Sequence, residues 1–178
     1  MKNLTLLGGV ALAVTLFGMS SAGVGAYGAY NYNIEETKPV VNSQQVECMA
    51  LNIYHEARSE SELGQRAVAY VTLNRVNDPA YPDNICGVVH QAVLKNNVPV
   101  RNKCQFSWYC DGKDDEPRNA EAYAEAKRVA LIVINRYGSS FDPTMGATMY
   151  HTDSVIPGWR TSFEKTTQIE NHIFYRKE

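Results

Sequence analysis

The sequence lacks the features that mark several large classes of protein. No long run of basic residues occurs in its 178 residues and the formal net charge is −2, so nothing indicates a nucleic-acid-binding face. No two cysteines have the Cys-x-x-Cys spacing and the four histidines are scattered singly, which argues against a structural zinc site. We therefore expect no metal, no cofactor and no nucleic-acid partner.

Charge is also almost absent from the beginning of the chain, where Lys2 is the only charged residue among the first 34. A mostly apolar run from Leu4 to Met19 is followed by small residues, and Val24-Gly25-Ala26 resembles a signal-peptide cleavage box. The weakly hydrophobic run up to Tyr30 also exceeds the roughly 20 residues that a membrane anchor needs. Residues 1–26 are therefore predicted to be a signal peptide or a membrane anchor. Either predicts export to the periplasm or the cell wall, and an anchor predicts membrane association.

The rest of the chain divides into a predicted linker, residues 27–42, and a predicted single domain with one core, residues 43–178. We expect this domain to be a monomer. An even number of cysteines in an exported domain favours disulfides, and three pairings are open. The candidate disulfide residues are Cys48, Cys86, Cys104 and Cys110.

Hydrophobic periodicity predicts a mainly helical, α+β domain. Apolar residues recur on one helical face from Ser43 to Ala57, and residues 59–62 resemble a capping box for a second helix that ends near Val76. Further predicted elements are helices at 86–94 and 117–136, with Gly138 after the latter, and short strands at 104–110, 147–151 and 173–175.

Glu56 is the most informative residue of the first predicted helix. It shares the apolar face of Met49 and Ile53. Burial on that face disfavours the charged carboxylate, so the carboxyl group can stay protonated near neutral pH. A general acid for glycoside cleavage needs that property. The alternative is a structural ion pair with Arg58 or Arg75.

Glu60 is the other carboxylate of this region. It follows Glu56 by four residues and is a candidate for the second carboxylate of a two-carboxylate glycosidase. Because it falls in the predicted corner between two helices, beside Ser59 and Ser61, we favour a capping or solvent role.

Several sequence blocks resemble the SleB-like family of spore-cortex-lytic and cell-wall hydrolases. They occur in the family's order and together extend from Val46 to Tyr175. The blocks are Tyr54-His-Glu-Ala-Arg-Ser-Glu60, Gly64-Gln-Arg-Ala-Val-Ala69, Leu73-Asn-Arg-Val76, Cys104-Gln-Phe-Ser107, Cys110-Asp-Gly112, Ala147-Thr-Met-Tyr-His151 with Trp159, and Ile169-Glu-Asn-His172. One departure is Ser59, where family members usually have Gly.

The resemblance implies a lysozyme-like, transglycosylase-type helical fold with a small sheet, and makes residues 43–178 a cell-wall hydrolase catalytic domain. It implies peptidoglycan glycan strands as the substrate and Glu56 as the catalytic acid. In lytic transglycosylase chemistry Glu56 protonates the oxygen between N-acetylmuramic acid and N-acetylglucosamine, and the muramic 6-hydroxyl closes a 1,6-anhydro ring. No second protein carboxylate is required. Hydrolysis of the same bond is the alternative outcome.

A second group of residues is predicted to bind the substrate. Alternation along a strand places Gln105 and Ser107 on one side, where amide and hydroxyl groups suit N-acetyl groups and sugar hydroxyls. Trp108, Tyr150 and Trp159 are candidates for stacking on a sugar ring, with core packing as the alternative for Phe106, Trp108 and Tyr150. The predicted substrate-binding residues are Gln105, Phe106, Ser107, Tyr150, Trp159 and Asn171.

Two other functions compete with glycan cleavage. An N-acetylmuramoyl-L-alanine amidase uses a metal-bound water, and the chain has histidines but no recognisable ligand spacing among them. A non-catalytic peptidoglycan-binding module would use Glu56 only structurally. The sequence is also compatible with either a phage endolysin or a bacterial remodelling enzyme.

Overall fold

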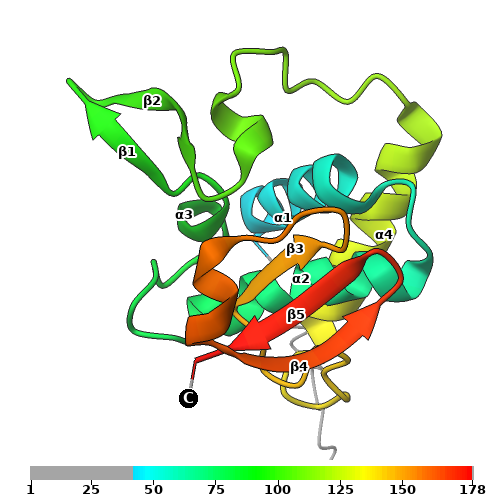
Figure 1. Cartoon of the computed structure of the whole chain (residues 1–178). Coiled ribbons are helices and arrows are strands. Elements are labelled where there is room, and N and C mark those ends of the chain that lie inside the picture. The colour runs from blue at the N-terminus through cyan, green and yellow to red at the C-terminus, as the bar shows by residue number, and fades with distance from the viewer. Residues whose placement is uncertain (1–41, 178) are drawn as a thin grey trace, which may run out of the picture. The chain divides into compact units, whose positions relative to one another are not determined.

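The computed structural model describes residues 42–177, and Figure 1 shows how their elements are arranged. The predicted signal peptide or anchor and nearly all of the predicted linker lie outside these residues. Within 42–177, no helix combines the length and the apolar character needed to cross a membrane.

Four α-helices form the body of the described region, and their caps explain where each of them begins. The side chains of Asn42, Ser61, Asn84 and Asn119 each accept a hydrogen bond from a backbone N–H in the first turn of the helix that follows. The helices are α1 (Ser43–Ala57), α2 (Glu62–Val76), α3 (Ile85–Val89) and α4 (Ala120–Arg136).

The hydrophobic core is centred on α1, which packs against α2, α3 and α4. Met49, Ala50 and Ile53 have no exposed surface and lie in one cluster with Val129 and Ala130 of α4. The helical face predicted from the sequence is therefore the buried face of α1, and it leads directly to Glu56 in the last turn.

Two antiparallel β-units complete the fold. One is the hairpin β1 (Ala92–Lys95) and β2 (Val98–Cys104), and the other is a three-stranded sheet in the order β3-β5-β4. The strands of the sheet are β3 (Met149–Thr152), β4 (Glu164–Ile169) and β5 (His172–Arg176). Phe174 of β5 is fully buried in a small cluster with Ala67 and Val71, which places the sheet against α2.

The predicted bounds of the first helix agree with α1, and the second helix ends at Val76 as expected. The predicted helix at 86–94 is wrong beyond Val89, because residues 92–104 form the hairpin. Asn96 and Asn97 both have positive φ angles, 53° and 63°, as a two-residue hairpin turn requires. Strand β4 was not predicted.

The predicted strand at 104–110 is also wrong. β2 ends at Cys104, and Ser107–Cys110 form the 3₁₀ helix η1. The Cys104–Cys110 disulfide explains this, since it holds the two Cα atoms 6.1 Å apart, whereas six extended residues would span about 20 Å.

All four cysteines are paired. Cys48 of α1 is bonded to Cys86 of α3, 38 residues further along the chain, and Cys104 is bonded to Cys110. The expectation of disulfides is confirmed, and the structure selects one of the three open pairings. Gly138 follows α4 with a φ of +78°, the conformation predicted for the end of that helix.

Candidate active site

Glu56 lies half-buried at the wall of a cavity between the end of α1, the loop after β2 and strand β3. The hydroxyl of Tyr150, on β3, donates a hydrogen bond of 2.8 Å to Glu56 Oε2. The cavity has a volume of about 230 Å³ and is lined by Glu56, Arg75, Cys104, Gln105, Phe106, Ser107, Met149, Tyr150 and Trp159.

Arg75 of α2 forms the floor of this cavity and is only 4% exposed. Its Nε donates to the carbonyl oxygen of Thr148 at 2.7 Å, and its guanidinium lies 5.1 Å from the centroid of the Phe106 ring. Its Nη1 has no hydrogen-bond partner among residues 42–177. The guanidinium therefore places a positive charge in the interior near Glu56.

The surroundings of Glu56 act on its proton in opposite directions. Burial raises the pKa of Glu56, while the hydrogen bond from Tyr150 and the charges of Arg75 and His55 lower it, and burial dominates. Burial and the neighbouring Glu56 hold the pKa of Tyr150 well above its ordinary value, so Tyr150 stays a neutral donor. A raised pKa is the direction that a general acid needs.

The segment after β2 forms the facing wall. Gln105 and Ser107 are exposed, whereas Phe106 between them is buried against Arg75. The alternation expected from a strand therefore persists although the segment is not a strand. The amide and hydroxyl groups are free to meet a ligand while Phe106 anchors the wall in the core.

Aromatic side chains take different positions around the site. Trp159 is half-buried at the cavity, and its ring packs edge-on against His151 and Tyr175. Trp108 is 7% exposed and donates from Nε1 to Asn52 Oδ1 at 3.1 Å. Trp159 is therefore available to a sugar ring, and Trp108 belongs to the core.

Five of the six residues predicted to bind substrate lie together with Glu56 in the cavity, and Asn171 does not. Its Nδ2 donates to Glu60 Oε1 at 3.2 Å, at the corner between α1 and α2. There the side chain of Glu170 accepts from the backbone N–H of Ser61 at 3.1 Å, and its hydrogen bond to Glu60 raises the pKa of Glu60. Neither Glu60 nor Asn171 lines the cavity.

Two features of the site were not assigned from the sequence. Met149 lines the cavity and its sulfur lies 3.9 Å from Arg75 Nη2. Tyr150 was expected to bind sugar or pack in the core; it packs against both hydrophobic clusters, lines the cavity and in addition donates to the carboxylate of Glu56. Periodicity could not reveal this contact, because Glu56 and Tyr150 are 94 positions apart.

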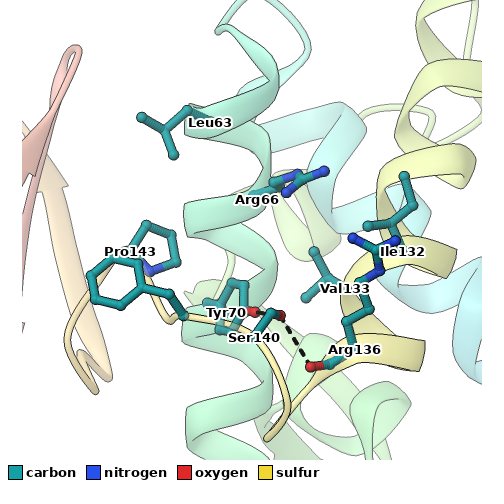
Figure 2. A pocket seen from close by; sticks show the side chains of 9 residues that line it. Leu63, Arg66, Tyr70, Ile132, Val133, Arg136, Ser140 and Pro143 are labelled. Atoms are coloured by element: carbon teal, nitrogen blue, oxygen red, sulfur yellow. Dashed lines mark hydrogen bonds between the residues drawn. The ribbon is translucent and has the colours of Figure 1, made fainter.

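A second hollow, of about 280 Å³, lies between α2 and α4 (Figure 2). Figure 2 shows a hydrogen bond between the Tyr70 hydroxyl and Ser140 Oγ, which in turn donates to the backbone carbonyl oxygen of Arg136. No carboxylate lines this hollow. It therefore offers no group for acid catalysis, unlike the cavity at Glu56.

A sequence profile of the cell wall hydrolase family matches residues 59–175. The chain belongs to this family. The matched span includes Arg75, Tyr150 and Trp159, and Glu56 lies three residues before it.

Curated members of the family are similar over most of this chain. The spore cortex-lytic enzyme of Halalkalibacterium halodurans is 33% identical over 150 residues, which cover 80% of this chain and 38% of that protein. The spore cortex-lytic enzyme of Bacillus subtilis is 28% identical over 134 residues, 75% of this chain and 38% of that protein. The chain thus spans less than half the length of these relatives.

Two solved structures of the family resemble the fold. The catalytic domain of the Bacillus cereus SleB protein has a TM-score of 0.56 and 29% identity, covering 76% of this chain and 91% of that one. The catalytic domain of the germination-specific lytic transglycosylase SleB from Bacillus anthracis has a TM-score of 0.58 and 28% identity, covering 78% and 98%. The expected α+β fold class is confirmed.

Proposed function

We propose that this protein cleaves peptidoglycan glycan strands between N-acetylmuramic acid and N-acetylglucosamine, with Glu56 as the acid, and leaves 1,6-anhydro-muramic ends. The observation that carries the proposal is the half-buried Glu56, held by Tyr150 in a cavity walled by Gln105, Ser107 and Trp159. Support for the reaction type comes from the Bacillus anthracis relative, which is described as a lytic transglycosylase.

In the proposed reaction, neutral Glu56 gives its proton to the glycosidic oxygen as the bond from that oxygen to the anomeric carbon breaks. The resulting carboxylate is stabilised by the hydroxyl of Tyr150 and the charge of Arg75. It then takes the proton of the muramic 6-hydroxyl as that oxygen bonds to the anomeric carbon. The same group serves as acid and base, no water is consumed, and Glu60 has no part.

The organisation of the chain follows from this proposal. Residues 43–178 act as the catalytic domain on peptidoglycan as a monomer, with Gln105, Ser107 and Trp159 contacting the glycan, Tyr150 holding the carboxyl group of Glu56 and Phe106 anchoring the wall. Asn171 would not contact the glycan and would instead stabilise the corner between α1 and α2 through its hydrogen bond to Glu60. Residues 1–26 direct the protein out of the cytoplasm as a signal peptide or an anchor, and residues 27–42 link them to the domain.

The amidase alternative has less support from the geometry. The four histidines of the chain have different aromatic neighbours. His55 is stacked on Trp108 and His151 on Tyr175, His90 is tilted against Tyr109, and His172 lies edge-on to Tyr150. Activity that is lost in chelator and restored by zinc, with released peptides and intact glycan, would favour the amidase instead.

The test is to digest purified peptidoglycan with the full chain and with Glu56→Gln, using Glu60→Gln as a matched control, and to identify the products by mass spectrometry. We expect 1,6-anhydro-muramic ends from the wild type and from Glu60→Gln, and at least about a thousandfold lower rate for Glu56→Gln. Reducing muramic ends would mean hydrolysis. Equal rates for the wild type and Glu56→Gln would remove the acid role.

A further inference from the structure

A third cavity adjoins the candidate active site on the side of the hairpin. It has a volume of about 300 Å³ and is lined by Gln91, Ala92, Val93, Lys103, Cys104 and Gln105. Cys104 and Gln105 also line the cavity of Glu56. A ligand that follows Gln105 out of the active site therefore enters this adjoining cavity, which we call the hairpin pocket.

The hairpin pocket carries a positive charge without a partner. Residues 92–110 contain three basic residues and no acidic one. Of the three, Arg101 is occupied, since its Nε donates to the carbonyl oxygen of Asp111 at 3.1 Å. Lys103 is exposed, lines the pocket and forms no ion pair within residues 42–177. Its ammonium group is therefore available to an anion.

The pocket also holds an acceptor that needs a donor. Gln91 Oε1 is buried and has no hydrogen-bond partner among residues 42–177, although the backbone carbonyl of Gln91 accepts from the N–H of Gln105 at 2.8 Å. A buried polar atom without a partner costs free energy, which a ligand recovers by donating an N–H. Beside it, Val93 is 56% exposed and offers an apolar contact.

We propose that the hairpin pocket binds the stem peptide of peptidoglycan, with Lys103 meeting a stem carboxylate and Gln91 accepting a peptide N–H. This rests on the proposed function, because the stem hangs from the muramic sugar whose bond Glu56 cleaves. The glycan itself offers no free anion where a stem is attached. A stem peptide carries carboxylates, amide N–H groups and methyl side chains together, which match Lys103, Gln91 and Val93.

The arrangement of the elements favours an extended ligand here. Figure 1 shows β1 and β2 reaching away from the helices as a two-stranded arm. The strands pack mainly against each other and η1, and the side chains of Val93, Leu94 and Val98 are more than half exposed. A stem peptide that leaves the cavity at Gln105 can lie along this arm without displacing any other element.

The test compares two forms of the same soluble glycan strands, one with free stem carboxylates and one with these carboxylates converted to amides. Both are prepared from peptidoglycan stripped of teichoic acid. Dissociation constants are measured by fluorescence anisotropy with the full chain carrying Glu56→Gln, so that strands stay intact. The added variant is Lys103→Gln, and the matched control is Lys95→Gln, on the same hairpin but outside the pocket.

We expect the Glu56→Gln protein to bind the free-carboxylate strands about threefold to tenfold more tightly than the amidated strands. Lys103→Gln should abolish this preference and Lys95→Gln should keep it. Equal affinity for both strands, or a preference that survives Lys103→Gln, would overturn the proposal. The proposal would also be overturned if free teichoic acid displaced both forms of the strands equally, since Lys103 would then bind a phosphate polymer.

The outcome is separate from that of the proposed function. Binding needs no cleavage, so a preference for free carboxylates can be found even if wild-type protein yields no anhydro ends. Conversely, if the wild type cleaves both forms and the Glu56→Gln protein binds them equally, the proposed function stands and only the stem-peptide subsite is lost.

Discussion

Glu56 is the residue on which the proposed chemistry depends, and its environment suits both halves of the proposed reaction. Burial favours the protonated carboxyl group that must give up a proton, whereas Tyr150 and Arg75 favour the carboxylate that results. A single group that must act first as acid and then as base needs both influences. Tyr150 is the direct contact, and Arg75 acts from the floor of the cavity.

Replacing Tyr150 with Phe removes the hydrogen bond to Glu56 and leaves the ring in place. Because that bond lowers the pKa of Glu56, its loss raises the pKa and shifts the alkaline limb of the activity profile to higher pH. We also expect kcat to fall about tenfold, the equivalent of one hydrogen bond to a charged group. The measurement is kcat as a function of pH.

The control for this prediction is Tyr81→Phe. Tyr81 lies against Arg75, its hydroxyl contacts Met149 Sδ at 3.7 Å, and it does not line the cavity. Its removal should leave the alkaline limb in place. An unchanged limb in Tyr150→Phe, or a shift to lower pH, would show that Tyr150 does not hold the Glu56 carboxylate.

At the scale of elements, the two disulfides connect different parts of the fold. Cys48–Cys86 ties α1 to the short helix α3 across 38 positions, whereas Cys104–Cys110 closes a loop of six positions that carries the wall of the site. A cross-link stabilises a fold by restricting the unfolded chain, and more so for a longer loop. The first bridge should therefore matter more for stability and the second more for activity.

Replacing Cys48 and Cys86 together by Ala should lower the free energy of unfolding by about 4 kcal/mol, and replacing Cys104 and Cys110 by about 2 kcal/mol. The second pair should nevertheless reduce kcat/KM more, because Gln105 and Ser107 lose their fixed position. Denaturant unfolding and kinetics on peptidoglycan give the two values. The reverse order in kcat/KM would show that the wall does not depend on its bridge.

At the scale of the whole molecule, the described region has one helical core and a small sheet set against α2. The walls of the Glu56 cavity come from α1, α2, β3, the segment 104–107 and the 3₁₀ helix η2 (Gly158–Ser162), which carries Trp159. Every part of the site therefore depends on the packing of elements from the whole region. The described residues 42–177 belong to one compact unit, so this region is expected to fold alone.

Residues 38–178, produced without the preceding segment, should unfold in one cooperative transition and retain the cleavage pattern of the full chain. We expect the midpoint of thermal unfolding to agree with that of the full chain within about 2 °C, since one core carries the stability. Calorimetry and product analysis check this. Two separate transitions would contradict a single core, and loss of activity with an intact fold would show that the first 37 residues contribute to activity.

Local signals determined a large part of this protein from the sequence alone. The apolar spacing of Met49 and Ile53 is a property of neighbouring turns of one helix, so α1 and the unusual place of Glu56 followed from it. The order of the sequence blocks indicated the family, which the profile over residues 59–175 confirms. The Asn96-Asn97 turn was a further local signal, and it would have located the hairpin.

Only the tertiary structure decided the contacts between distant positions. Three findings depend on elements that meet in space. They are the pairing of the four cysteines, the 3₁₀ helix η1 where a strand was predicted, and the position of Asn171 outside the cavity. The same holds for the hydrogen bond from Tyr150 to Glu56. Periodicity reports which face of an element is buried, and only packing determines which residue it is buried against.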